Sequence, residues 1–421
     1  MRKNLLFISV FALFSLITIA QEQPKFGITF NGFVKTDVIW DSRQTVNIRE
    51  GHFLLYPANE LLDKNGDDIN ATANFNILSI QTRLRGNITG PDAFGAKTSG
   101  AIEGEFFGHS DADVNGFRLR HAYVQLNWAK TELMVGQNWH PMFATNCFPD
   151  VVSFNTGAPF LPFTRNPQIR LTQQFNDFKI MLSAISQRDF VSNGPDGPSS
   201  KYLRNSSIPD LNLRMEYEKK NTDKGTSFLA GVTGNYKILT PRLVTDSTFK
   251  TDQKASSIAG TAYVKVVIPA VTVKLGGIYA QDAHDLTMIG GYAVENITDT
   301  ITGFAEYAPI ATMSGWFDIN TNNKVWQIGL FGGYSKNLGA GSELTTELTK
   351  DKKPVFYSRG TNIEYLYRIS PRFIYNAGKF RISPEIEYTV AAYGTTQTDG
   401  TVDQSKEIGN LRLLLGIYFF F

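Results

Sequence analysis

Cysteine is almost absent from the chain, because Cys147 is the only one among 421 residues. A single cysteine excludes an intrachain disulfide and any cysteine-rich metal cluster. After the first twenty residues the chain also lacks an apolar run long enough to cross a bilayer as a helix. A soluble exported protein fits that absence. A protein that crosses a membrane with strands fits it too, since strands of alternating polarity leave no long hydrophobic block.

The first twenty residues predict a secretory signal peptide. Arg2 and Lys3 precede an apolar stretch, and Thr18 and Ala20 form a small-x-small cleavage site. Removing this segment takes away two positive charges, which lowers Lys+Arg from 41 to 39 and makes it equal to the 39 Asp+Glu. A net charge of one sign is therefore lacking, and any electrostatic function must depend on where the charges are placed.

Residues 21–421 form a single predicted domain, because no linker, charge block or internal repeat divides them. The pattern is one of strands throughout, with about sixteen expected. We place them near residues 27–41, 75–87, 98–109, 116–128, 131–138, 168–176, 178–187, 208–218, 226–237, 255–268, 270–283, 311–320, 323–335, 361–376, 379–393 and 407–421.

The predicted connections sort by length. Most of those after even-numbered strands are tight, such as Asn176-Asp177 and Pro269-Ala270, whereas most of those after odd-numbered strands are long, such as 42–74, 139–167 and 284–310. Outer-membrane barrels have short periplasmic turns and long extracellular loops. The fold class predicted is therefore an all-β transmembrane antiparallel barrel of the bacterial outer membrane. We expect both termini in the periplasm, and outer-membrane lipid and lipopolysaccharide around the wall.

The last strand is strongly amphipathic. One face carries Leu411, Leu413, Leu415, Ile417, Phe419 and Phe421, and the other carries Arg412 and Tyr418. A terminal strand that ends on an aromatic residue resembles the C-terminal signature of bacterial outer-membrane barrels. The resemblance implies recognition by the barrel-assembly machinery through Phe421.

Alternation assigns each strand a lipid face and a lumen face, and an arginine or lysine at the lipid midplane costs about 2–4 kcal/mol. On the second strand Leu78, Ile80 and Leu84 are expected to face lipid. The predicted lumen set is Arg83, Arg85, Arg170, Arg214, Lys265, Lys274, Arg368, Arg372, Arg381 and Arg412, with Glu103, Glu105, Glu216, Glu218, Glu364, Glu385 and Glu387. Either these charges pair with one another to hold the wall, or they form a net positive pore that favours anions.

The fourth strand does not alternate simply. Arg118 and Arg120 share parity with Val124 and Leu126, which are apolar. Either a bulge resets the register, or the two arginines lie above the membrane near the outer rim. Both interpretations stay open from the sequence.

The third long connection, residues 139–167, is apolar and aromatic, unlike a solvated loop. We predict that it folds inward and narrows the pore, and packing on a neighbouring protomer is the alternative. Its polar candidates for the constriction are His140, Asp150, Asn155, Thr156 and Arg165.

Metal, cofactor and enzyme signals are weak. Asp63, Asn65 and Asp67 resemble the start of a calcium loop, but Asn74 stands where the pattern needs a Glu, so an acidic surface turn is favoured. No cofactor is expected. No nucleophile elbow or zinc-binding helix motif appears, and no basic patch interleaved with aromatic residues indicates nucleic-acid binding.

Two stretches resemble the dicarboxylate-type (DcaP-like) porin family. They are GFRLRHAYVQLNWAKTELMVGQNWHPMF, residues 116–143, and SPRFIYNAGKFRISPEIEY, residues 370–388. The signal peptide resembles those of Bacteroidota. The resemblance implies a sixteen-stranded homotrimer that prefers small anionic solutes. Its RLRH segment corresponds to Arg118, Arg120 and His121, and its GQ-x-W segment to Gln137 and Trp139.

The sequence therefore predicts a porin with a modest preference for anions such as carboxylates. A substrate-specific channel and a mainly structural or adhesive barrel are the alternatives. The residues expected to line the pore or its constriction are Arg83, Arg85, Glu103, Glu105, Arg118, Arg120, His121, Gln137, Asp150, Arg165, Arg170, Arg214, Arg368, Arg372, Arg381 and Arg412.

Overall fold

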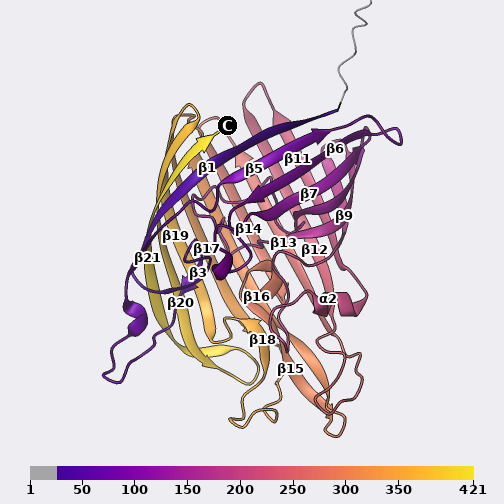
Figure 1. Ribbon diagram of the computed structural model, residues 1–421, viewed down its shortest axis with the longest axis vertical. Coiled ribbons are helices and arrows are strands. Elements are labelled where there is room, and N and C mark those ends of the chain that lie inside the picture. Colours follow the sequence, from indigo (N-terminus) through magenta and orange to yellow (C-terminus); the bar gives the residue numbers. More distant parts are fainter. Residues whose placement is uncertain (1–25) are drawn as a thin grey trace, which may run out of the picture.

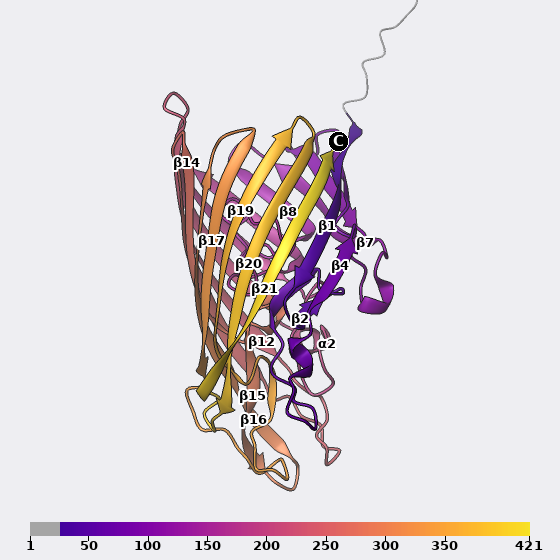
Figure 2. The ribbon, with the colours of Figure 1, turned by 90° about the vertical axis from the view of Figure 1, so that its left-hand side faces the viewer.

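The computed structural model describes residues 26–421, and the predicted signal peptide lies outside the described residues. The chain forms a closed antiparallel β-barrel of sixteen strands (Figure 1), which confirms the predicted fold class. The first and last strands pair along a register that includes Phe33 with Phe420 and Val38 with Leu415. Figure 2 shows these two strands side by side. The sheet therefore has no free edge at this seam.

The barrel strands follow one another around the wall, and β4 and β5 are two segments of one strand. Their bounds are β1 Gly27–Asp41, β4 Asn74–Leu78, β5 Arg83–Thr89, β6 Lys97–Glu105, β7 Arg118–Asn127, β8 Thr131–Trp139, β9 Arg165–Phe175, β10 Phe178–Ile185, β11 Asp210–Asn221, β12 Thr226–Leu239, β13 Ala255–Val267, β14 Val271–Gln281, β16 Phe304–Thr321, β17 Trp326–Gly339, β19 Ile363–Ala377, β20 Phe380–Thr396 and β21 Val402–Phe420.

The connections are sorted by length as predicted. Only residues 176–177 join β9 to β10 and only residues 378–379 join β19 to β20, whereas 140–164 join β8 to β9. The short turns lie at one end of the barrel, together with the start of β1 and the C-terminus, and the long loops lie at the other end (Figure 1). We refer to these as the short-turn end and the long-loop end.

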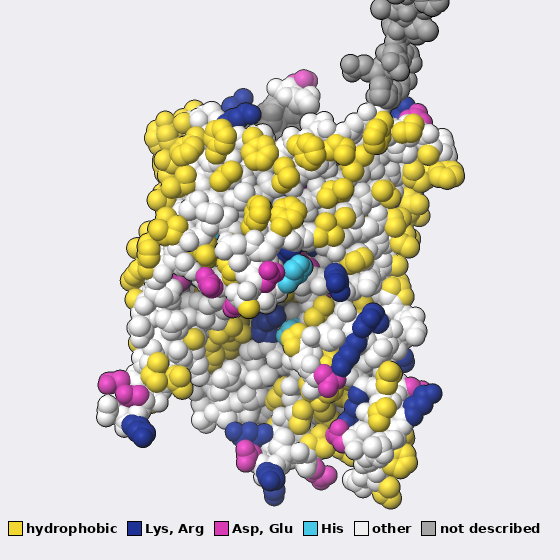
Figure 3. Space-filling model, in the orientation of Figure 1, with side chains coloured by type: hydrophobic (Ala, Val, Ile, Leu, Met, Phe, Trp, Pro, Cys, Tyr) yellow, Lys and Arg dark blue, Asp and Glu magenta, His cyan; other side chains and the backbone are white. Residues whose placement is uncertain are grey.

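Alternation separates an apolar outer face from a polar inner face. On β11, Leu211, Leu213 and Met215 are exposed, while Arg214 and Glu216 are buried. In Figure 3 hydrophobic side chains cover the upper part of the visible face, and charged side chains gather toward the long-loop end. The period of two predicted these faces correctly on most strands.

The second strand is an exception, because residues 79–82 leave the ladder between β4 and β5. β4 pairs with the later half of β1 and β5 with its earlier half. The backbone N–H of Lys35 donates instead to Thr82 Oγ1 at 3.2 Å. The break changes the parity, so Leu78 and Ile80 are buried inside the barrel while Leu84 faces outward. The prediction that Leu78 and Ile80 face lipid was wrong.

A β-bulge decides between the two interpretations of the fourth strand. Glu103 pairs with His121 but Gly104 pairs with Leu119, so Arg120 is the extra residue. A bulge places two residues opposite one and shifts the alternation that follows. Arg118 and Arg120 are both buried on the inner side, while Val124 is exposed on the outer side.

Two long loops fill part of the interior. In the first, β2 (Thr45–Ile48) pairs with β3 (Phe53–Pro57), and every β3 side chain is buried. β3 packs in one hydrophobic cluster with Phe154, Phe160 and Phe163 of the loop between β8 and β9. The inward position of residues 53–57 was not predicted from the sequence. The signal was present, because residues 53–57 are as apolar as the third loop.

Two further strands extend the sheet at the long-loop end. β15 (Gly290–Asp299) pairs with the early part of β16 and with β18 (Phe356–Arg359). The long connection predicted over 284–310 therefore contains β15 and the beginning of β16. The helices are short: η2 Ile69–Ala71, η3 Asp111–Asp113, α2 Lys201–Ser206 and η4 His284–Leu286. Within the described part of the chain, none is long and apolar enough to cross a membrane.

Candidate functional site

A cavity of about 720 Å³ lies in the short-turn half of the barrel, between the inner wall and residues 148–154 of the third long loop. Its lining holds seven arginines but only two carboxylates, Glu103 and Asp150. The arginines are Arg83, Arg85, Arg120, Arg170, Arg214, Arg372 and Arg381. This cavity is the candidate functional site, because it concentrates charge of one sign in a chain that is nearly neutral.

Two glutamates on β6 organise the arginines at one side of the cavity. Glu103 lies 2.7 Å from Arg120 and 3.2 Å from Arg85. Glu105 lies 2.6 Å from Arg120, 2.8 Å from Arg118 and 3.2 Å from Arg83. The bulge on β7 makes this possible, because it lets Arg118, Arg120 and the following His121 all sit on the inner side.

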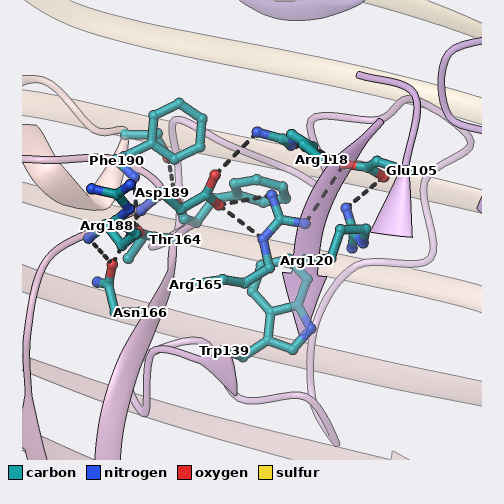
Figure 4. Close-up of polar contacts among 12 residues, drawn as sticks. Glu105, Arg118, Arg120, Trp139, Thr164, Arg165, Asn166, Arg188, Asp189 and Phe190 are labelled. Carbon is teal, nitrogen blue, oxygen red and sulfur yellow. Dashed lines mark hydrogen bonds and ion pairs between the residues drawn. The ribbon is translucent and has the colours of Figure 1, made fainter. Parts of the chain in front are cut away.

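A third carboxylate completes the group from the loop after β10. Asp189 lies 3.1 Å from Arg118 and 2.7 Å from Arg165 (Figure 4). Burial alone raises the pKa of the Asp189 carboxyl, but the neighbouring Arg165 and Arg118 outweigh burial and hold this pKa below its usual range. No strand pattern pointed to Asp189, since the residue lies in a loop.

We call this group the paired cluster: Arg83, Arg85, Arg118, Arg120, Arg165, Glu103, Glu105 and Asp189. Five guanidinium groups and three carboxylates leave a formal surplus of two positive charges. Aromatic rings pack on its outer members, with the Arg118 guanidinium 4.3 Å from the Phe107 ring centre and Arg165 5.0 Å from that of Trp139. Such stacking suits a planar guanidinium.

Two other lining arginines have no carboxylate partner among residues 26–421. Arg170 donates to the Trp139 carbonyl oxygen and to Gln168 Oε1, each at 2.7 Å. Arg381 donates to Asn376 Oδ1 at 2.8 Å and lies over the ring of Phe420. Neither has an ion pair within 4.0 Å in the part of the chain that the structure describes. We call Arg170 and Arg381 the free arginines.

Arg170 also lines a second cavity. This cavity, of about 570 Å³, lies against the inner faces of β8 to β11 and shares Thr145, Arg170 and Arg214 with the first. Arg214 lines both cavities too, but it is paired with Glu216. Arg170 is therefore the arginine at this junction that has no carboxylate partner among residues 26–421.

The remaining wall arginines are held by carboxylates. Arg372 lies 2.7 Å from Asp318, Arg412 2.7 Å from Asp41, and Arg368 3.5 Å from Glu387. Asp41 and Asp318 are buried inside the wall, although the predicted lumen set omits both. The same alternation identifies them, since Asp41 shares parity with Lys35 and Asp318 with Ser314.

The structure divides the sixteen residues expected to line the pore into two groups. Those on the lining of the first cavity are Arg83, Arg85, Glu103, Arg120, His121, Asp150, Arg170, Arg214, Arg372 and Arg381. Those outside that lining are Glu105, Arg118, Gln137, Arg165, Arg368 and Arg412. Gln137 instead donates to the carbonyl oxygens of Leu119 and Arg120, at the β7 bulge.

The polar candidates of the third loop are also spread apart. Asn155 and His140 are buried, and Asn155 donates to the Leu54 carbonyl oxygen at 3.3 Å and to Glu387 at 3.1 Å. Asp150 and Thr156 lie on the cavity lining. Asp150 is 2.6 Å from Lys274 of the wall. Only some of these residues therefore line the cavity.

The calcium-loop-like segment, residues 63–67, forms a turn that is closed by hydrogen bonds within the segment. Asp63 Oδ1 accepts the backbone N–H groups of Asn65 at 2.8 Å and Asp67 at 2.9 Å. These backbone donors lower the pKa of the exposed Asp63 carboxyl. Over residues 26–421, no group of three or more His, Cys, Asp or Glu side chains is arranged to hold a metal ion.

Comparisons with known proteins support the architecture. The chain is similar to the outer membrane channel DcaP of Acinetobacter baumannii, with 14% identity, coverage of 94% of this chain and 97% of that one, and a TM-score of 0.67. It is also similar to the trimer form of OmpT, an outer membrane protein of Vibrio cholerae, with 10% identity, coverage of 94% and 99%, and a TM-score of 0.51.

A porin refined at 1.8 Å resolution is similar at 12% identity, with coverage of 94% and 100% and a TM-score of 0.50. At such identities the likeness shows a shared barrel fold. No protein-family model matches the chain, and no curated protein sequence matches it.

Proposed function

We propose that this protein is an outer-membrane porin, a passive channel for small hydrophilic solutes with a modest preference for anions such as carboxylates. The observation that carries the proposal is the arginine-rich cavity inside a closed sixteen-strand barrel. An apolar outer face with charged side chains turned inward is the arrangement that a membrane-spanning barrel requires. DcaP, the channel with the similar fold, supports the same assignment.

In this proposal the short turns lie in the periplasm and the long loops lie outside the cell. Solutes then pass the long loops, cross the level of the third loop and enter the arginine-lined cavity. The protein performs no chemistry on them and serves as a wall of fixed charges and hydrogen-bond donors. We accordingly propose a channel and no enzymatic activity.

Anion preference follows from the balance of charge around the cavity. The paired cluster has a surplus of two positive charges, and the free arginines add two more. Water and salt screen each of these charges, so a single arginine has a limited effect. Several cations facing one narrow space still raise the local concentration of anions.

Recognition of one solute is the second candidate function. Trp139, Phe143 and Phe148 line the cavity beside the arginines, and the rings of Trp139 and Phe143 stack at 4.2 Å between centres. An aromatic surface next to cations favours an anion with an apolar body. Current block by a single solute at low concentration would favour this function over general diffusion.

We also propose a homotrimer in outer-membrane lipid and lipopolysaccharide, inserted by the barrel-assembly machinery through Phe421. OmpT of Vibrio cholerae, a barrel of similar fold, has a trimer form. Light scattering corrected for bound detergent tests the assembly. A stable monomer contradicts the trimer and leaves the channel proposal intact.

Reconstitution into a planar lipid bilayer tests the channel itself. Purified protein should produce discrete, ohmic current steps in potassium chloride. Protein that is folded, as judged by heat-modifiable gel mobility, and carries no current after reconstitution contradicts the channel and favours a structural or adhesive role.

A further inference from the structure

Three lysines of the barrel wall donate hydrogen bonds to backbone carbonyl oxygens of the third loop. Lys35 Nζ lies 2.8 Å from the Val152 oxygen, Lys265 Nζ 3.1 Å from the Asn146 oxygen, and Lys274 Nζ 2.9 Å from the Phe148 oxygen. The bonded segment is only seven residues long, from 146 to 152. Its backbone is therefore held at three points by flexible cationic side chains.

The anchors stand on different sides of the barrel. β13 and β14, which carry Lys265 and Lys274, are neighbours, whereas β1 is separated from them by many strands in either direction around the wall. A segment bonded to both places must cross the lumen. Residues 146–152 are thus suspended between two parts of the wall.

The backbone N–H groups of the same region donate hydrogen bonds to carboxylates of the barrel wall. The N–H groups of Val152 and Ser153 donate to Glu385, and the N–H of Asp150 donates to Asp318 at 3.2 Å. A loop buried in a barrel must find partners for its backbone groups, because water is displaced. Charged wall side chains supply them here.

The three lysines are poorly placed to act as pore charges. None of them is on the lining of either cavity, and Lys35 and Lys274 are almost fully buried. Each of these two also has a carboxylate close by, Asp37 at 3.1 Å from Lys35 and Asp150 at 2.6 Å from Lys274. The three lysines instead donate hydrogen bonds to the third loop.

We propose that Lys35, Lys265 and Lys274 are positioning residues, a three-lysine clamp that holds residues 146–152 across the lumen and thereby sets the width of the passage. The effect on flow rests on the proposed channel function. The clamp itself does not, and it can be measured on a barrel that conducts nothing.

The chain contains a reporter within the clamped segment. Cys147 is the single cysteine, and it lies between the residues bonded by Lys265 and Lys274. Burial raises the pKa of its thiol to about 11. In the folded protein Cys147 should therefore react slowly with N-ethylmaleimide, and local opening of the loop should be needed for the reaction.

The test compares the alkylation rate of Cys147 in the full-length protein in detergent. K265M/K274M removes two cations at similar side-chain length, and we expect the rate to rise about tenfold, since bonds to charged groups hold the closed loop. K265R/K274R keeps the donors and should return the rate toward wild type. The matched control is K179M, because Lys179 also lines the lumen but makes no polar contact with the loop among the described residues.

Heat-modifiable mobility confirms that each variant is folded. An unchanged rate in folded K265M/K274M overturns the clamp, and so does an equal rise in K179M. If the double variant does not fold, the single variant K265M is the test. We expect the alkylation rate of Cys147 to rise about threefold in K265M, and an unchanged rate contradicts the clamp. Bilayer currents then test the effect of the clamp on the passage. Noisier currents with little change of the reversal potential support a positioning role. A large shift of the reversal potential with unchanged Cys147 reactivity identifies the lysines as pore charges.

Discussion

The paired cluster and the free arginines use the same side chain in different surroundings. In the paired cluster Arg118 and Arg120 are buried and bonded to Glu105 at 2.8 and 2.6 Å. Arg170 and Arg381 line the 720 Å³ cavity and have only neutral partners. The guanidinium group is identical in both places, so the difference in role comes from the neighbours alone.

From that difference we expect the arginines of the paired cluster to maintain the fold and the free arginines to set the electrostatic potential in the cavity. Removing one partner of a buried ion pair costs about 3–5 kcal/mol, because it leaves an uncompensated charge away from water. A charge that faces a water-filled space has a small desolvation cost, so its removal changes stability little. Water and salt also weaken its influence on passing ions. Stability and selectivity should therefore be separable by mutation.

The largest effect is expected from E105Q. Glu105 balances Arg83, Arg118, Arg120 and Arg165, so its neutralisation leaves these cations facing one another. We expect a loss of about 3–5 kcal/mol in the free energy of unfolding. Urea unfolding followed by heat-modifiable gel mobility measures it.

Glu218 provides the matched control for that variant. It lies on β11 and is 2.9 Å from Lys220, in an exposed pair. Exposed pairs contribute about 0–1 kcal/mol, so E218Q should unfold close to wild type. Equal stability of E105Q and E218Q would show that the cluster is not the structural centre described here.

A second comparison separates the two kinds of arginine at constant charge. R170Q/R381Q and R83Q/R85Q each remove two positive charges. The first pair should move the reversal potential toward zero with little loss of stability. The second should lower the urea midpoint as well, because Arg83 and Arg85 balance Glu105 and Glu103 at 3.2 Å.

Bilayer recordings and urea titrations of the same preparations give both readouts. The distinction between the two groups fails if R170Q/R381Q is the less stable double variant, or if it leaves the reversal potential unchanged while R83Q/R85Q shifts it.

The smallest effect is expected at an exposed turn far from either group. D63A removes the acceptor for the Asn65 and Asp67 N–H groups, so trypsin should cut after Lys64 a few times faster while the unfolding midpoint stays constant. D67A, whose side chain accepts neither bond, is the control. Because the pKa of Asp63 is lowered in the folded protein, its local stabilisation of this turn is present above the ordinary aspartate pKa. It is lost as pH falls through the lowered pKa, so cleavage after Lys64 should become faster there.

Much of the barrel could be predicted because its signal repeats. Period-two alternation and sorted loop lengths recur on most hairpins, so an error of a few residues at one strand end does not change the strand count. β1 begins and ends where the alternation placed it, while β21 begins at Val402, five residues earlier than expected. Most inward arginines followed from the same rule.

The site needed information that the sequence pattern does not carry. The bulge at Arg120 and the break at residues 79–82 change parity without a glycine or proline to mark them. The partners of Arg118 and Arg165 include Asp189, which comes from another loop. Counting lumen charges without Asp37, Asp41 and Asp318 therefore overstated the free positive charge of the wall.

The reversal potential across a potassium chloride gradient tests the central claim most directly. The wild-type protein, inserted in a neutral planar bilayer, should give the sign of an anion-preferring channel. The magnitude should grow as the salt concentration falls, because the Debye length lengthens from about 10 Å at 0.1 M to about 30 Å at 0.01 M. A reversal potential of cation sign at low salt would contradict the account, and Glu103 and Asp150 would then be the lining residues that set the field.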